Sequence, residues 1–104
     1  MPLAVDIDRD SLRDFCRRWK VTEFALFGSV TRPDEFRDDS DVDVLVRFAA
    51  DAPWSLLEWV TMEEELAAIF RRSVDLVERE AVEESDNRFR RRSILDSVVL
   101  LDVA

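Results

Sequence analysis

The only glycine of this chain, Gly28, lies between two stretches that favour β-strands, and this arrangement constrains the fold more than any other feature. Residues 21–27 are rich in β-forming side chains and end at Gly28, while residues 41–48 alternate apolar and polar side chains. Glycine is the residue that most readily adopts the backbone conformations of a tight turn. We therefore predict two core strands joined by a short helical turn at residues 29–32 and a charged loop at residues 33–40.

The rest of the chain predicts helices around these strands. The apolar spacing indicates one helix from Asp8 or Asp10 to about Trp19 and a longer one over residues 54–72, followed by a strand at residues 74–77. A polar stretch leads to Asn87, a basic helical segment covers residues 88–96, and residues 98–101 form either a last strand or a continuation of that helix. In the long helix we expect Glu58 and residues 63–65 to lie outside. The apolar stripe that faces the core should comprise Leu56, Trp59, Val60, Leu66, Ala67 and Phe70.

Composition narrows the range of functions. A chain of 104 residues supports one hydrophobic core, so we expect a single α/β domain over residues 1–104. The net charge of −9 disfavours direct nucleic-acid binding and binding to anionic membranes, although a local basic patch remains compatible with it. The absence of histidine excludes Ser-His catalysis and histidine zinc sites. Any chemistry must therefore use carboxylates, hydroxyls, Arg, Lys or a bound metal.

Cellular location is also suggested by the sequence. The single cysteine, Cys16, cannot form an internal disulfide and lies among apolar helix positions, where we expect it to be buried. No apolar run approaches the roughly 18 residues that span a bilayer, and no signal peptide is recognisable. These features favour a cytoplasmic protein.

Asp41 and Asp43 are the first candidates for a functional site. Side chains two positions apart on a strand lie on the same face, so these carboxylates should be adjacent while the intervening valine enters the core. Two neighbouring carboxylates repel each other unless a cation lies between them, and Mg²⁺ is a natural partner for oxygen ligands. A solvated acidic start of a strand is an equally good reading of this pair taken alone.

Gly28 and Ser29 offer a phosphate-binding turn beside that pair. A glycine at a strand end lets backbone N–H groups and the serine hydroxyl approach a phosphate at the start of a helical turn. Arg32, one turn later, could neutralise the same phosphate. An ordinary strand-to-helix turn also uses small residues, so this signal gains weight only together with the aspartates.

The combined pattern resembles a known family. An apolar strand, Gly-Ser, a loop and then Ser-Asp-x-Asp leading a second apolar strand is similar to the signature of the DNA polymerase β-like nucleotidyltransferases, and in particular of the minimal, or MNT-type, members. The signature covers residues 24–48, and the resemblance implies a small mixed β-sheet with helices packed on it. Residues 30–40 are one residue longer than the family's usual loop, and Pro33 replaces a common glycine, so we expect a reshaped phosphate-side loop.

The resemblance also implies residue roles and a reaction. Asp75 matches the family's third carboxylate, so Asp41, Asp43 and Asp75 would be catalytic and would bind two Mg²⁺ ions, while Gly28, Ser29 and Arg32 would bind the nucleotide. The alternative for Asp75 is a solvent-exposed acid at a strand edge. The implied chemistry is a two-metal, in-line attack by an acceptor hydroxyl on the α-phosphate of ATP.

Small members of this family typically act as antitoxins, which transfer AMP to a tyrosine of a helical HEPN-type ribonuclease toxin. The resemblance therefore implies an ATP- and magnesium-dependent protein adenylyltransferase in a complex with such a toxin. Two alternatives stay open: a catalytically inactive protein that neutralises its partner by binding alone, and a transferase acting on a small molecule. The arginines of residues 88–92 could contact triphosphate, nucleic acid or an acidic partner, although a solvated helix face is the commoner explanation.

Overall fold

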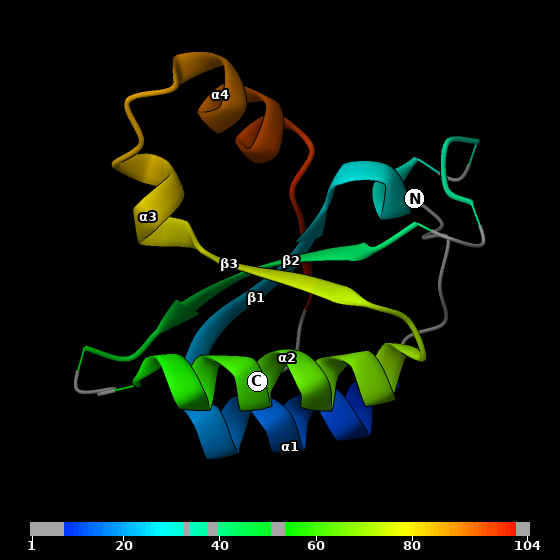
Figure 1. The fold of residues 1–104 in the computed structure, drawn as a ribbon, viewed down its shortest axis with the longest axis vertical. Helices are drawn as coiled ribbons and strands as arrows, with labels where there is room; N and C mark the ends of the chain where they lie inside the picture. Colours follow the sequence, from blue (N-terminus) through cyan, green and yellow to red (C-terminus); the bar gives the residue numbers. More distant parts are fainter. Residues whose placement is uncertain (1–7, 33, 38–39, 51–53, 102–104) are drawn as a thin grey trace.

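One mixed four-stranded sheet forms the centre of the computed structural model, which describes residues 8–32, 34–37, 40–50 and 54–101. The strands are β1 Val21–Phe27, β2 Val42–Phe48, β3 Val74–Glu78 and β4 Val99–Leu101, in the order β3-β2-β1-β4. β2 runs parallel to β3, and β1 is antiparallel to both β2 and β4 (Figure 1). The predicted strands are confirmed, and the final segment is a strand. Pro33 and parts of the predicted loop and chain ends lie outside the described residues.

Two helices, α1 Arg9–Trp19 and α2 Leu56–Phe70, lie together on one face of the sheet (Figure 1). α1 begins where the Asp8 carboxylate accepts a hydrogen bond from the Ser11 N–H. α2 begins at Ser55, whose N–H donates to the Glu58 carboxylate at 2.8 Å in a capping box. Both helices end at residues of positive φ, Lys20 and Arg71, which turn the chain into the next element.

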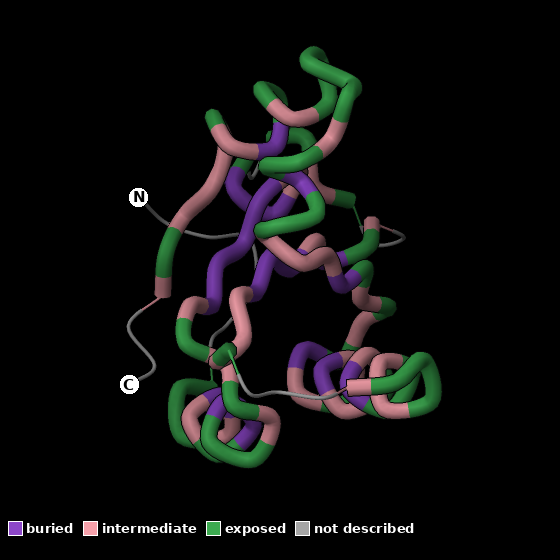
Figure 2. Tube along the Cα trace, turned by 90° about the vertical axis from the view of Figure 1, so that its left-hand side faces the viewer, coloured by how far each residue is buried: buried purple, intermediate pink, exposed green. Residues whose placement is uncertain are grey.

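The main hydrophobic core lies between these helices and the sheet (Figure 2). Val42, Val44 and Val46 are fully buried there, which confirms that the valines of β2 face the core. Cys16 is buried as expected, and burial raises the pKa of its thiol to about 12. From the two helices the core receives Leu12, Phe15, Met62, Leu66 and Phe70.

The buried face of α2 differs from the predicted stripe. Leu66 and Phe70 are buried as predicted, whereas Leu56 and Val60 are exposed. The helix packs through Met62, Leu66 and Phe70, which recur every four residues, so the N-terminal part of the predicted stripe is wrong. Trp54 precedes the helix and packs on Trp19 with its indole N–H donating to the Trp19 carbonyl at 2.9 Å.

Two glutamates of α2 lie closer to the core than predicted. The Glu63 carboxylate accepts the Leu76 N–H at 3.1 Å, and the Glu65 carboxylate accepts the Trp19 indole N–H at 3.0 Å. Burying part of a carboxylate is tolerated here because each has a hydrogen-bond donor. These two residues therefore connect α2 to β3 and to α1.

The opposite face of the sheet carries two shorter helices, α3 Arg79–Glu83 and α4 Arg88–Asp96 (Figure 1). α4 was predicted, whereas α3 lies in what the sequence presents as a polar stretch. A second core cluster joins both helices to the sheet: Ala25, Phe27, Leu45, Val82 and Ile94. The face of β2 that bears Asp43 is therefore covered at its middle, where Leu45 is buried.

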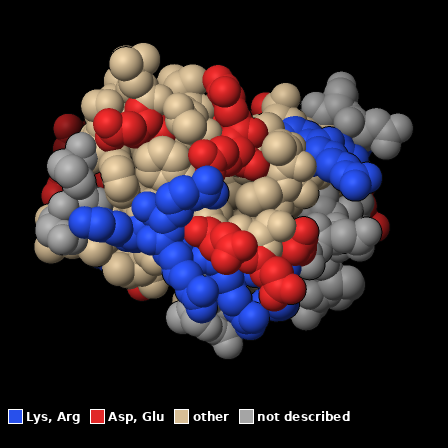
Figure 3. Space-filling model, turned by 90° about the horizontal axis from the view of Figure 1, so that it is seen from below, with Lys and Arg blue, Asp and Glu red and all other residues tan. Residues whose placement is uncertain are grey.

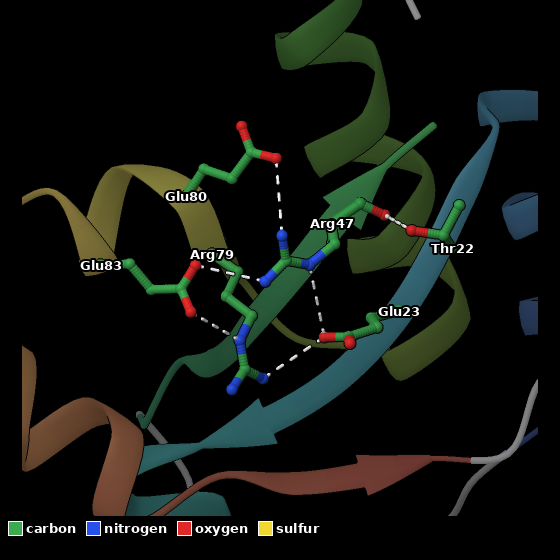
Figure 4. Close-up of polar contacts among 6 residues, drawn as sticks. All are labelled: Thr22, Glu23, Arg47, Arg79, Glu80 and Glu83. Carbon is green, nitrogen blue, oxygen red and sulfur yellow. Dashed lines mark hydrogen bonds and ion pairs between the residues drawn. The ribbon is translucent and has the colours of Figure 1, made fainter. Parts of the chain in front are cut away.

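An ion-pair network fixes α3 to the far end of that face (Figure 4). Arg47 of β2 pairs with Glu80 and Glu83 of α3, and Arg79 pairs with Glu83 and with Glu23 of β1. Arg47 also lies 3.8 Å from the Glu23 carboxylate. The basic and acidic members alternate, so each charge has opposite neighbours, and α3 is held on the sheet at the end away from Asp43.

The outer surface of α1 and α2 carries both signs of charge (Figure 3). Arg18 of α1 pairs with Glu65 of α2 at 2.8 Å, and Arg13 lies 3.6 Å from Asp10. Exposed pairs of this kind contribute little stability, so packing rather than charge joins the two helices. Among the helices of the described residues, none has the length and apolar character needed to cross a bilayer.

Candidate active site

Asp43 and Asp75 are register partners on adjacent parallel strands. Neighbouring strands lie about 4.8 Å apart, so the two residues face the same side of the sheet at close range. Their positions follow from the fold, because α2 returns the chain so that β3 lies beside β2 in parallel. The register between β2 and β3 therefore places two of the predicted site residues, Asp43 and Asp75, directly opposite each other.

Asp41 lies just before β2, two positions from Asp43, and it is exposed, as is Asp75. The pKa of the Asp43 carboxyl is raised to about 6, first by partial burial and then by the negative charges of Asp75 and Asp41. The positive charge of Arg32 acts in the opposite direction. Asp43 is therefore the centre of a group of negative charges, which Arg32 partly offsets.

Gly28 packs directly against the Asp43 carboxylate. A Cβ atom at position 28 would overlap the carboxylate oxygen Oδ2 and would lie 3.3 Å from the Asp43 Cγ atom. Gly28 also has a φ of +74°, a conformation that side chains other than glycine's rarely adopt. The turn after β1 consequently requires glycine for two independent reasons, and it lies beside the acidic centre.

Ser97 is the partner of this turn that the sequence did not reveal. Its Oγ accepts the Gly28 N–H at 3.3 Å and donates to the Ile94 carbonyl at 3.1 Å. Ser97 is the residue after α4, so the link joins the C-terminal helix to the glycine turn across 69 positions of sequence. A small polar residue at a helix end is too common a feature to predict such a contact.

Ser29 lies on the 3-10 turn η1, Gly28–Thr31, and Arg32 is the residue directly after it. The Thr31 hydroxyl donates to the Gly28 carbonyl at 2.7 Å, and the Arg32 N–H donates to the Ser29 carbonyl at 2.9 Å, which closes the turn. The Arg32 guanidinium pairs with Glu35. All three predicted nucleotide-binding residues therefore lie at one end of the sheet with the aspartates.

The donor set at this end of the sheet fits a hard divalent cation. Within the described ranges, no group of three or more ligating side chains is arranged to hold a metal ion by itself. Mg²⁺ is usually held by one or two carboxylates together with substrate phosphates and water, so a pair such as Asp43 and Asp75 is a sufficient protein contribution. Burial and then the negative charges of Asp75 and Asp41 raise the pKa of Asp43, and a cation bound here would balance those charges.

A hollow of about 140 Å³ lies further along the same face, between α3 and α4. Val77 of β3 forms part of its lining, two positions beyond Asp75 on the same side of the strand. The acidic residues, the glycine turn and this hollow therefore follow one another along a single face of the sheet.

Comparison with known proteins identifies relatives of this arrangement. The model of a family described as "Nucleotidyltransferase domain" matches residues 9–101. Protein adenylyltransferase MntA of Thermococcus cleftensis is 43% identical over 65 residues, which cover 62% of this chain and 63% of that relative. The chain thus spans less than two thirds of that relative's length.

Solved structures show the same fold. A structure described as a minimal nucleotidyltransferase superposes with a TM-score of 0.67 at 29% identity, covering 89% of this chain and 88% of the other. A tri-AMPylated Shewanella oneidensis HEPN toxin in complex with an MNT antitoxin includes a chain with a TM-score of 0.59 at 19% identity, covering 92% of this chain and 70% of the other. At that lower identity the likeness concerns the fold alone.

Proposed function

This chain belongs to the nucleotidyltransferase domain family, and from that premise we propose that it transfers AMP from ATP to a tyrosine hydroxyl of a HEPN-type ribonuclease toxin. By this modification it acts as the antitoxin of its partner in the cytoplasm. The observation that carries the proposal is the pairing of Asp43 with Asp75 beside the Gly28 turn. Carboxylates next to a phosphate-binding turn are the groups that nucleotidyl transfer requires.

Each site residue has a role in this proposal. The turn that begins at Gly28 and Ser29 binds the triphosphate, and Arg32 neutralises part of its charge. Asp41, Asp43 and Asp75 would hold two Mg²⁺ ions, which supply charge neutralisation of the attacking and leaving oxygens. Asp75 would accept the proton of the acceptor hydroxyl, and its exposure on β3 supports this role.

The transfer is a single displacement at phosphorus. The acceptor oxygen forms a bond to the α-phosphorus of ATP, and the bond from that phosphorus to the bridging oxygen of the β-phosphate breaks. The hydroxyl proton passes to Asp75, and pyrophosphate leaves. This chain needs no histidine for any of these steps, in agreement with its composition.

Two comparisons support the acceptor and the partner. The relative from Thermococcus cleftensis is named as a protein adenylyltransferase, which favours AMP as the transferred group and a protein as the acceptor. The Shewanella oneidensis complex contains an AMPylated HEPN toxin bound to a chain of this fold, which favours a stable complex with such a toxin.

The proposal is tested by co-expressing the chain with a HEPN-type toxin encoded beside it and measuring the toxin's mass. We expect an increase of one or more AMP units with the wild type, and a decrease in transfer of about 10²-fold or more for Asp43→Asn or Asp75→Asn. Asp96→Asn, at an exposed position of α4, is the matched control and should transfer normally. An unmodified toxin in the presence of active wild-type protein, ATP and Mg²⁺ would contradict the proposal.

The same experiment separates the two alternatives. If Asp43→Asn protects cells from the toxin as well as the wild type does, the chain neutralises its partner by binding alone. If the toxin stays unmodified while a small hydroxylated compound such as an aminoglycoside gains AMP, the chain is a small-molecule transferase. The pairing of Asp43 with Asp75 favours catalysis over binding alone, because neighbouring carboxylates destabilise a fold that makes no use of them.

A further inference from the structure

The hollow between α3 and α4 has the size and lining of a site for one side chain. Its floor is apolar and comprises Val77, Val82 and Ile94, of which the last two are buried. Its volume of about 140 Å³ is well below the roughly 300 Å³ at which pockets for whole small-molecule ligands begin. A planar apolar group fits such a space, whereas a complete nucleotide does not.

The hollow is aligned with Asp75 along β3. Val77 and Asp75 are two positions apart and share a face of the strand, which places them about 6.6 Å apart along the strand axis. β3 is an edge strand, and in the described part of the sheet no strand pairs with its outer side. A side chain from another protein can therefore approach the hollow and Asp75 from the same edge.

Two arginines give the rim of the hollow a positive charge. The Arg91 guanidinium donates to the Glu83 carbonyl at 3.3 Å, which fixes it beside the opening. Arg90 also lines the hollow, and its guanidinium makes no hydrogen bond or ion pair with any described residue. Arg90 is exposed, so both guanidinium groups are accessible to an anionic group that approaches the hollow, on a protein whose net charge is otherwise −9.

We infer that this hollow is the acceptor site, and that it takes a tyrosine ring from an acidic segment of the partner protein. The inference rests on the proposed function and adds a binding site and a sequence preference to it. The ring packs on Val77, Val82 and Ile94, acidic neighbours of the tyrosine pair with Arg90 and Arg91, and the hydroxyl points toward Asp75. Its oxygen then attacks the α-phosphorus, its proton passes to Asp75, and pyrophosphate leaves.

Filling the hollow tests the inference directly. Ala81 lines it from an exposed position of α3, so Ala81→Phe should occupy the space without disturbing the core. We expect the KM for a tyrosine-bearing acceptor to rise by about 10-fold or more while the KM for ATP stays unchanged. Ala81→Ser is the matched control, because it adds little volume and should behave as the wild type does.

Charge reversal tests the rim. Arg90→Glu and Arg91→Glu should each lower kcat/KM for the acceptor by about 10-fold through its KM. Arg92→Glu makes the same change in net charge one position further on, at a side chain that is 84% exposed and pairs with Asp96 outside the hollow. It should leave the acceptor KM within about 2-fold of the wild-type value.

A binding measurement separates this inference from the proposed function. A peptide with one tyrosine between glutamates is titrated into the isotope-labelled protein, and the amide signals of Ala81, Val82 and Ser85 should shift. A peptide with the tyrosine between lysines should bind at least about 10-fold more weakly. Shifts confined to other surfaces, or wild-type transfer kinetics in Ala81→Phe and Arg90→Glu, would overturn the acceptor site while leaving the transferase activity intact. If the wild type transfers no AMP but the glutamate peptide shifts these signals, the proposed function fails and the binding site stands.

Discussion

Gly28 lies against the carboxylate of Asp43, so that the turn after β1 and the acidic centre of β2 form one structural unit. The register of the sheet explains the contact, because Phe27, the residue before the turn, is the partner of Asp43 across β1 and β2. The Gly28 turn cannot move away from the acidic centre without breaking this strand pairing. The geometry of the candidate site is thus set by backbone hydrogen bonds.

Substitution of Gly28 should damage both stability and activity. In Gly28→Ala the new methyl group overlaps the Asp43 carboxylate, and the φ of +74° becomes strained. We expect the free energy of unfolding to decrease by about 1–3 kcal/mol and nucleotide transfer to be lost. Urea denaturation and a transfer assay measure the two effects.

A double variant separates the two causes. Asp43→Ala removes the carboxylate that the methyl group would meet, so it should restore part of the stability that Gly28→Ala loses. The remaining loss reports the strained φ alone. Purely additive effects of the two substitutions would show that the contact carries no energy.

The sequence was sufficient to predict the part of the site that depends on local patterns. The alternation through Asp41 and Asp43 has the period of a strand, and a lone glycine at the end of a β-rich run marks a turn. The pairing of Asp43 with Asp75 could not be predicted from local patterns, because the register of β3 against β2 depends on the length and packing of α2. Only the resemblance to a family connected Asp75 with the other two acids before the structure did.

The elements that the prediction missed depend on contacts between distant residues. α3 is five residues long and mostly charged, and it is held by one buried side chain, Val82, and by ion pairs with Arg47 and Glu23 of the sheet. The exposure of Leu56 and Val60 follows from which face of α2 meets the sheet, and several apolar positions compete for that face. Neither feature has a signal in local sequence periodicity.

The stability of the metal-free protein should depend on Asp43 in a defined pH range. The pKa of Asp43 is raised from 3.8 to about 6, so between these values the unfolded chain releases a proton that the folded protein keeps. Stability therefore falls as the pH rises from about 4 to 6 and stays lower above pH 6. Asp43→Asn should remove this loss and stabilise the protein at pH 7.5 by about 1 kcal/mol, because partial exposure screens the interaction.

This effect is measured by urea denaturation at pH 4 and pH 7.5 in the presence of a chelator. The wild type and Asp43→Asn should unfold at nearly the same urea concentration at pH 4 and differ at pH 7.5. Asp96→Asn on exposed α4 is the control and should follow the wild type at both pH values. An Asp43→Asn variant that is less stable than the wild type at pH 7.5 would contradict the prediction.

Magnesium should stabilise the folded protein through the paired carboxylates. A ligand that binds only the folded state raises its stability, and about 1 kcal/mol corresponds to roughly 4–8 °C in the Tm of a chain of this size. We expect Mg²⁺ with a non-hydrolysable ATP analogue to raise the Tm of the wild type by this order. Asp43→Asn and Asp75→Asn should lose most of the increase, and Asp96→Asn should keep it. If the Tm of Asp75→Asn rises as much as that of the wild type, Asp75 is not a ligand of Mg²⁺.

The link between Ser97 and Gly28 should affect nucleotide binding more than global packing. Ser97→Ala leaves the Gly28 N–H without its acceptor, which costs about 1–3 kcal/mol for a partly buried donor. The turn then loses its attachment to α4 while the strand pairing still holds it beside Asp43, so we expect the KM for ATP to rise while the KM for the acceptor stays constant. Denaturation and steady-state kinetics with each substrate varied measure these quantities.

Ser97→Thr retains the hydroxyl and should recover the ATP KM, and Ser93→Ala, at an exposed position of α4, should have no effect. Equal changes in both KM values would instead mean that Ser97 stabilises α4 in general, and that the glycine turn keeps its position without it.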